Sequence, residues 1–226
     1  MAVREIVFDT ETTGFNPMDG HKVVEIGAVE LINHMPTGNY YHQYINPHRE
    51  MPEEAYNVHG LSEEFLRGHP GFSEVAADFL EFIGDADLIA HNASFDMNFI
   101  NYELKTIGRA QLTNNVIDTL NMAKNLFPGA KNNLDALCKR YGVDNSERTN
   151  HGALLDSELL AKVYLEMIGG QEPTMEFENK ALKKDVYASK ANNNEIRESR
   201  NYKVSGDDIV SHEEFLKKTL KLEEVW

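Results

Sequence analysis

The feature that most constrains this chain is an apolar run that ends in two carboxylates, over residues 6–14. Residues 6–8 predict a short buried strand. Asp9 and Glu11 follow at a spacing of two, which in a strand puts both side chains on one face. Two adjacent anions repel each other, and a divalent cation between them removes that repulsion. The residues therefore indicate either a metal site or only an acidic turn after a strand.

Length and cysteine usage narrow the class of protein. The 226 residues suffice for one well-buried domain with residues to spare. No apolar run approaches the roughly 18 residues that a membrane helix needs, and no signal-peptide core follows Met1. Because Cys138 has no second cysteine with which to form a disulfide, we expect a reducing, cytoplasmic location.

The net charge of −15 argues against a protein that coats nucleic acid, since such proteins need an excess of lysine and arginine. An acidic surface can still bind phosphate where its carboxylates hold metal ions, because the bound cations then dominate the local charge. The charge therefore leaves a metal-dependent nuclease open.

The order of apolar patterns predicts the fold class. Residues 23–32 and 40–45 predict two further strands joined by a turn at Gly38 and Asn39, which with the first strand make an antiparallel meander. Apolar segments at residues 88–90 and 116–117 predict two more strands. Helical patterns alternate with them, at residues 52–58, 72–83 (capped by Ser73), 93–106, 118–127, 133–141 and from about 153 to 168. The prediction is an α/β protein whose mixed sheet, part meander and part parallel, is flanked by helices.

Gly169 and Gly170 mark the predicted end of the folded domain, residues 1–170. Residues 171–208 are polar, with almost nothing to bury between 191 and 200, and predict a mostly flexible linker. Residues 209–226 are apolar again but too few to form a core alone, so we expect them to dock on a partner or on the domain.

Two further motifs place carboxylates at element ends. Asp96 falls in the first turn of a predicted helix, directly after an apolar strand and His91. It either stabilises the helix dipole or faces the end of the first strand. His151 precedes the last helix by one glycine, and Asp156 lies in its first turn. These two are either surface residues or, given the freedom at Gly152, two groups that point into one cleft.

Four carboxylates and a histidine suit phosphoryl transfer with two metal ions, which activate a water and stabilise the leaving 3′ oxygen. Asp9 is the natural bridging ligand, and Glu11 and Asp156 would complete the site of one ion. Asp96 would act on the second ion. His151 titrates near neutrality and can take the proton of the attacking water.

The sequence resembles the three motifs of the DEDDh 3′→5′ exonuclease family. The segments that carry the resemblance are DTETTG from Asp9, HNASFD from His91 and HGALLD from His151. The histidine at the start of the third motif indicates the DEDDh branch. The resemblance covers residues 1–170 and is strongest to the proofreading subunits of bacterial DNA polymerase III. It implies a ribonuclease-H-like fold and 3′→5′ release of nucleoside monophosphates with two Mg²⁺ or Mn²⁺ ions.

The resemblance also implies the roles of individual residues. It assigns metal binding to Asp9, Glu11, Asp96 and Asp156, and the base to His151. Substrate contacts are implied for Asp9, Glu11 and Asp156 and, at the terminal nucleotide of a single-stranded or frayed DNA 3′ end, for Thr12, His59 and Phe95. His59 lies in the short family motif VHGL, which starts at Val58.

The tail extends the resemblance more loosely. Gln171, Met175 and Phe177 are spaced like a peptide that binds a sliding clamp, with one residue more than the usual form. Residues 209–226 would then bind the polymerase catalytic subunit. A proofreading subunit is the main hypothesis. The alternatives are a free-standing exonuclease for RNA or small oligonucleotides, similar to ribonuclease T or oligoribonuclease, and a non-catalytic adaptor subunit.

Overall fold

The computed structural model describes residues 2–148 and 150–169, together with Gly206 and Val210. Its centre is a five-stranded sheet in the order β3-β2-β1-β4-β5. The strands are β1 (Arg4–Thr12), β2 (Val23–Ile32), β3 (Met35–Tyr44), β4 (Asp87–Ala90) and β5 (Val116–Asp118). β1 pairs antiparallel with β2 and parallel with β4, so the predicted mixed sheet is confirmed.

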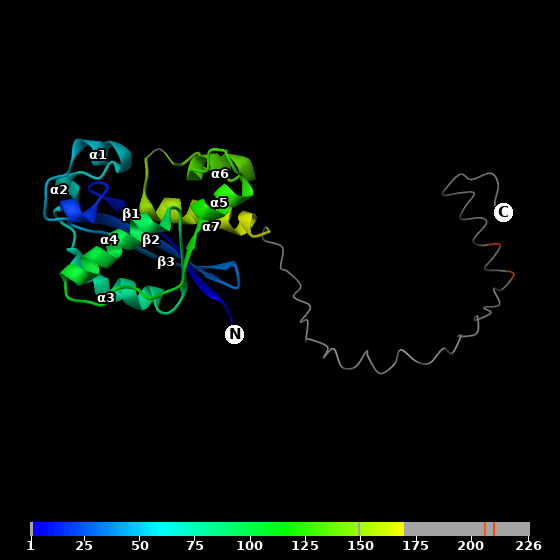
Figure 1. The fold of residues 1–226 in the computed structure, drawn as a ribbon, viewed down its shortest axis with the longest axis horizontal. Helices are drawn as coiled ribbons and strands as arrows, with labels where there is room; N and C mark the ends of the chain where they lie inside the picture. The colour runs from blue at the N-terminus through cyan, green and yellow to red at the C-terminus, as the bar shows by residue number, and fades with distance from the viewer. Residues whose placement is uncertain (1, 149, 170–205, 207–209, 211–226) are drawn as a thin grey trace. The chain divides into compact units, whose positions relative to one another are not determined.

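Helices cover both faces of this sheet (Figure 1). They are the 3-10 helix η1 (Pro17–Asp19) and α1 (Glu53–His59), α2 (Glu63–Leu66), α3 (Phe72–Ile83), α4 (Ala93–Thr106), α5 (Thr119–Leu126), α6 (Leu134–Tyr141) and α7 (Ala153–Met167). The helix predictions are accurate to within one or two residues at most ends. η1, three residues long, was not predicted.

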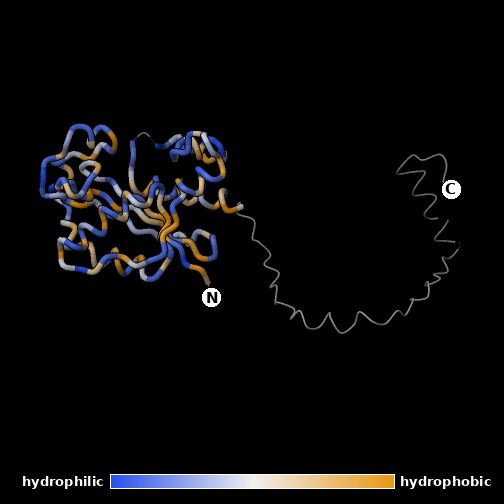
Figure 2. Tube along the Cα trace, in the orientation of Figure 1, coloured by the Kyte–Doolittle hydropathy of each residue, from blue (hydrophilic) through white to orange (hydrophobic). Residues whose placement is uncertain are grey.

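Successive side chains of a strand point to opposite faces of the sheet, and a hydrophobic core lies on each face. Ile6 and Phe8 of β1 pack with α3 and α4 on one face, while Val7 packs with α6 and α7 on the other. Figure 2 shows the hydrophobic residues gathered along the central strands. β1 is thereby covered on both faces and fixed in the middle of the sheet, and its C-terminal end carries the first two predicted site residues.

One close approach decides where α7 lies. Gly27 pairs with Asp9 across the sheet, and a Cβ atom at Gly27 would lie 2.2 Å from the backbone carbon of Ala153. The hydroxyl of Ser157 donates to the Gly27 carbonyl at 2.9 Å. The absence of a side chain at Gly27 therefore lets the first turn of α7 sit directly on β2.

Two local predictions were wrong. The β2–β3 turn lies at Asn33 and His34, both in the left-handed region, because a two-residue loop of that hand matches the strand twist. Gly38, the predicted turn, lies inside β3 near a register shift and is tolerated because β3 is an edge strand. α3 begins after Gly71, which makes no side-chain cap, because the buried Phe72 already belongs to the helix; Ser73 is not its cap.

The predicted linker (171–208) and C-terminal segment (209–226) lie outside the described residues, apart from Gly206 and Val210. The boundary at 170 and the clamp-binding roles of Gln171, Met175 and Phe177 therefore stay predictions. Within the part of the chain that the structure describes, no helix is both long and apolar enough to cross a membrane.

Candidate active site

The acidic end of β1 meets the start of α4. Asn92, in the left-handed region at φ 67°, turns the chain from β4 into α4, and its N–H donates to Asp118 at 3.1 Å. The next turn points Asp96 back at β1, where its Oδ1 accepts from the Thr10 N–H at 3.1 Å and from the Thr10 hydroxyl at 2.7 Å. Asp96 is therefore turned toward the strand, as the functional interpretation required.

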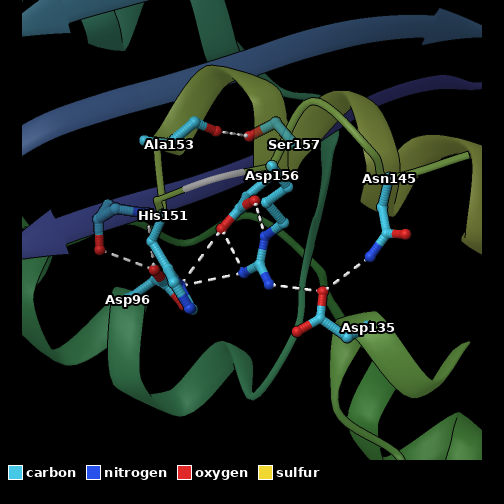
Figure 3. A network of polar contacts seen from close by, with 9 residues as sticks. Asp96, Asp135, Asn145, His151, Ala153, Asp156 and Ser157 are labelled. Carbon is cyan, nitrogen blue, oxygen red and sulfur yellow. Dashed lines mark hydrogen bonds and ion pairs between the residues drawn. The ribbon is translucent and has the colours of Figure 1, made fainter. Parts of the chain in front are cut away.

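α7 brings in the third motif. Gly152 is the extended residue before the helix, and the His151 N–H donates to the carbonyl of Val58 at 3.1 Å. This break lets His151 and Asp156 face each other, with His151 Nδ1 3.5 Å from Asp156 Oδ2 (Figure 3). Asp156 is buried and His151 is half exposed. His151 and Asp156 thus lie close together, and the prediction that they act in one cleft stays a prediction.

The donor atoms fit a divalent cation. Glu11, His151 and Asp156 each offer one ligand atom, and these atoms all lie within 4.8 Å of one another. Asp9 lies near enough to Asp96, Glu11 and Asp156 for their charges to act on it. Carboxylate oxygens from three elements, buried together, form the hard oxygen-rich set that Mg²⁺ and Mn²⁺ prefer.

The carboxyl groups have strongly raised pKa values. Burial, and then the charges of Asp96, Glu11 and Asp156, raise the pKa of Asp9 well above its usual value. Burial, followed by the charge of Asp156, raises the pKa of Glu11 to about 8. Burial raises the pKa of Asp96 to about 7, against the hydrogen bonds from Thr10. These groups resist ionisation together, and a bound cation would remove that resistance.

Sequence reasoning missed Arg148, which precedes His151 by three residues. Its guanidinium contacts Asp156, His151 and Asp135. Figure 3 labels these three partners. Burial first, and then this positive charge, lower the pKa of His151. No motif marks Arg148, since an arginine in a polar loop is ordinary in sequence.

Glu25 was also missed, because a glutamate within a strand is ordinary in sequence. It pairs with Glu11 across the sheet and accepts a hydrogen bond from His42 at 2.7 Å.

A cavity of about 180 Å³ reaches one of the candidate carboxylates, Glu11, and brings together Thr12, His59 and Phe95. His59 Nδ1 accepts from the Leu61 N–H at 3.0 Å. Its Nε2 is buried and, among the described residues, has no hydrogen-bond partner. The Phe95 ring packs against Phe99, with ring centroids 5.0 Å apart. The cavity thus combines apolar side chains with several polar ones, a combination typical of a ligand pocket.

Comparison with known proteins agrees with this geometry. The exonuclease family represented by RNase T matches residues 6–164. Curated proteins named DNA polymerase III subunit epsilon are similar over most of their length. That of Rickettsia felis is 48% identical over 225 residues, covering 97% of this chain and 98% of the relative. That of Haemophilus influenzae is 46% identical, covering 95% and 90%, and that of Escherichia coli K12 is 51% identical, covering 74% and 72%.

Solved structures give the same fold. Exonuclease X in complex with 5′ overhanging duplex DNA is 25% identical, with a TM-score of 0.58, over 74% of this chain and 90% of that one. The nuclease domain of a DEDDh family member bound to rAMP is 17% identical, with a TM-score of 0.62, over 74% and 91%. The expected ribonuclease-H-like fold is therefore confirmed.

Proposed function

We propose a function on one premise: the chain belongs to the exonuclease family, and within it to the epsilon subunits of DNA polymerase III. It is accordingly a 3′→5′ exonuclease of the replicase. Asp9, Glu11, Asp96 and Asp156 hold divalent cations, and His151 accepts the proton of the attacking water.

The observation that carries this assignment is the convergence of Glu11, His151 and Asp156 to within 4.8 Å, from β1 and from two positions around the start of α7. Bound cations would neutralise the carboxylates and lower the pKa of a water for attack on the terminal phosphodiester. We assign two ions, Mg²⁺ or Mn²⁺, because four carboxylates exceed what one such ion usually takes.

His151 is suited to the role of base. Burial, the largest cause, lowers its pKa and so favours the neutral imidazole, the form that can accept a proton. Half of its side chain is exposed, which leaves room for a water and a phosphate. Asp156, in the first turn of α7, holds its charge close to the ring and would stabilise the imidazolium that forms.

The 180 Å³ cavity would take the terminal nucleotide. Thr12 and the buried His59 Nε2 offer polar contacts to the sugar, and Phe95 offers an apolar face to the base. Packing on an aromatic ring accepts any base, which proofreading requires. The substrate would therefore be a single-stranded or frayed DNA 3′ end.

The tail supports the partner assignment. The similarity to the Rickettsia felis relative extends over 97% of this chain and so reaches beyond the domain. We propose that residues 171–208 link the domain to residues 209–226, that this last segment binds the polymerase catalytic subunit, and that Gln171, Met175 and Phe177 bind the sliding clamp. As a subunit of a bacterial replicase, the protein would work in the cytoplasm.

Digestion of a 5′-labelled single-stranded DNA oligonucleotide with Mg²⁺ tests the proposal, with a matched RNA oligonucleotide beside it. We expect a ladder that shortens from the 3′ end of the DNA. Degradation of RNA alone would contradict the proposal in favour of a free-standing ribonuclease, and inertness toward both would favour an adaptor.

A further inference from the structure

One side chain holds both oxygens of Asp156. The Nε of Arg148 donates to Asp156 Oδ1 at 2.5 Å, and its Nη2 donates to Oδ2 at 2.7 Å. Only 8% of the Arg148 side chain is exposed. This is the bidentate geometry in which a guanidinium binds a carboxylate most strongly.

The same guanidinium also contacts His151. Arg148 Nη2 lies 3.0 Å from His151 Nδ1. A guanidinium only donates hydrogen bonds, so Nδ1 is the acceptor. In a neutral imidazole the hydrogen is then on Nε2, and the single lone pair of the ring is the one that Arg148 engages.

These contacts of Arg148 are incompatible with the roles proposed for Asp156 and His151. The proposed function needs the Asp156 oxygens for a cation and the His151 lone pair for a proton. A fixed positive charge at bonding distance from Asp156 also repels a divalent cation there, since the site is buried and weakly screened. Arg148 must therefore leave both groups before either can act.

The structure provides a second anchor for Arg148. Its Nη1 already donates to Asp135 Oδ1 at 2.8 Å, and Asp135 accepts a further hydrogen bond from Asn145 at 3.0 Å. Asp135 lies in the first turn of α6, and 53% of its side chain is exposed. The guanidinium can rotate away from Asp156 without losing its bond to a carboxylate.

We propose that Arg148 is the internal counter-cation of the active site, and that a divalent cation displaces it from Asp156 and His151 onto Asp135. Arg148 is a positioning residue: it neutralises the carboxylates of the free protein and yields to the metal. The inference rests on the proposed metal-dependent function. Metal binding at Asp156 and freeing of the His151 lone pair then happen together, because the same guanidinium occupies both groups.

Calorimetric titration of the full chain with Mn²⁺ tests this without measuring activity. Arg148→Gln should bind Mn²⁺ roughly tenfold more tightly than wild type, because a competing charge is gone. A residue that merely supports Asp156 gives the opposite sign, a loss of about 10–100-fold. Arg148→Lys, which keeps the charge, should stay near wild type. Arg67→Gln, in an exposed pair with Glu63, is the control.

Asp135 supplies a second comparison. Asp135→Asn should weaken Mn²⁺ binding in the wild-type background, because the displaced arginine loses its anchor. In the Arg148→Gln background the same change should have no effect. Equal effects of Asp135→Asn in both backgrounds would overturn the exchange.

A spectroscopic readout needs no variant. In ¹⁵N NMR of the wild-type protein, saturating Mg²⁺ should shift the His151 Nδ1 resonance as its hydrogen bond from Arg148 is lost. A Nδ1 resonance unchanged by bound Mg²⁺, or weaker Mn²⁺ binding by Arg148→Gln, overturns the inference and leaves the proposed function standing. Wild type that binds no Mn²⁺ contradicts the proposed function itself, and the inference with it.

Discussion

Thr10 donates two hydrogen bonds to a single oxygen of Asp96, one from its backbone and one from its hydroxyl. Both residues are buried, and they lie 86 positions apart in the chain. The contact fixes the first turn of α4 against the end of β1. The position of Asp96 thus depends on a residue that is not itself a candidate ligand.

Thr10→Val should remove the hydroxyl donor while keeping the side-chain shape. We expect the free energy of unfolding to fall by about 1–3 kcal/mol at pH 8, because a buried acceptor loses a charge-assisted bond. Urea denaturation measures this. Thr113→Val, at an exposed loop position, is the matched control and should change stability by less than about 0.5 kcal/mol. Equal stability of the two variants would contradict the importance of the contact.

His151→Ala should lower turnover by roughly 10²–10⁴, the usual contribution of a general base. Its affinity for Mn²⁺ should stay close to that of wild type, since the carboxylates hold the cation. Single-turnover digestion and calorimetry on the same preparation separate the two quantities. A large loss of Mn²⁺ affinity would instead make His151 a ligand, because one of its ring nitrogens lies within 4.8 Å of carboxylate oxygens of Glu11 and Asp156.

Without divalent cations the protein should become less stable as the pH rises from about 5 to 8. The folded-state pKa of Glu11 is raised to about 8 and that of Asp96 to about 7. Between the unfolded and folded pKa values the folded protein binds more protons, so raising the pH favours unfolding. Their stabilising contribution is complete at low pH and is lost through this window.

Urea denaturation in a chelator at several pH values measures that slope, and Mg²⁺ should flatten or reverse it because bound carboxylates are ionised. Glu11→Gln, which removes one of the titrating groups, should lower the slope in the chelator. A slope that is identical with and without Mg²⁺ would contradict the assignment of these carboxylates to a cation.

Gly27→Ala should damage stability and activity together. The added Cβ would meet the Ala153 backbone at 2.2 Å, so α7 has to move. We expect a loss of about 1–3 kcal/mol or more from overpacking, and a loss of cleavage because α7 positions Asp156. Gly68→Ala is the control, since an added Cβ there meets no described atom within 4 Å. Thermal unfolding and digestion assays should separate the two variants; a Gly27→Ala protein with wild-type activity would show that α7 adjusts.

Much of the fold could be predicted, because the spacing of hydrophobic residues and the signals at helix ends determine most of its strands and helices. β1 was predicted in its place but too short, since it runs on through both carboxylates to Thr12, and the interruption at Gly152 before α7 was visible in the sequence. The β2–β3 turn was misplaced because Gly38 is the stronger local signal, whereas Asn33 and His34 adopt the left-handed turn in the folded hairpin. Local propensity is a weak guide where pairing between strands decides.

The candidate site was predictable in its ionisable motifs and not in its supporting contacts. Asp96 and Asp156 were found because each follows a boundary between elements. Arg148 and Thr10 were not, because their importance arises only from residues brought near by folding. A single sequence shows where carboxylates stand along the chain; it does not show which cation faces them.

The carboxylates of the site come from residue 9 at the beginning of the domain and from residue 156 near its end, and both must be in place before the set is complete. Pairings between such distant parts of a chain slow folding, because a long loop must close before they form. We therefore expect a nascent chain that ends before α7 to lack Asp156 and, with it, cleavage activity.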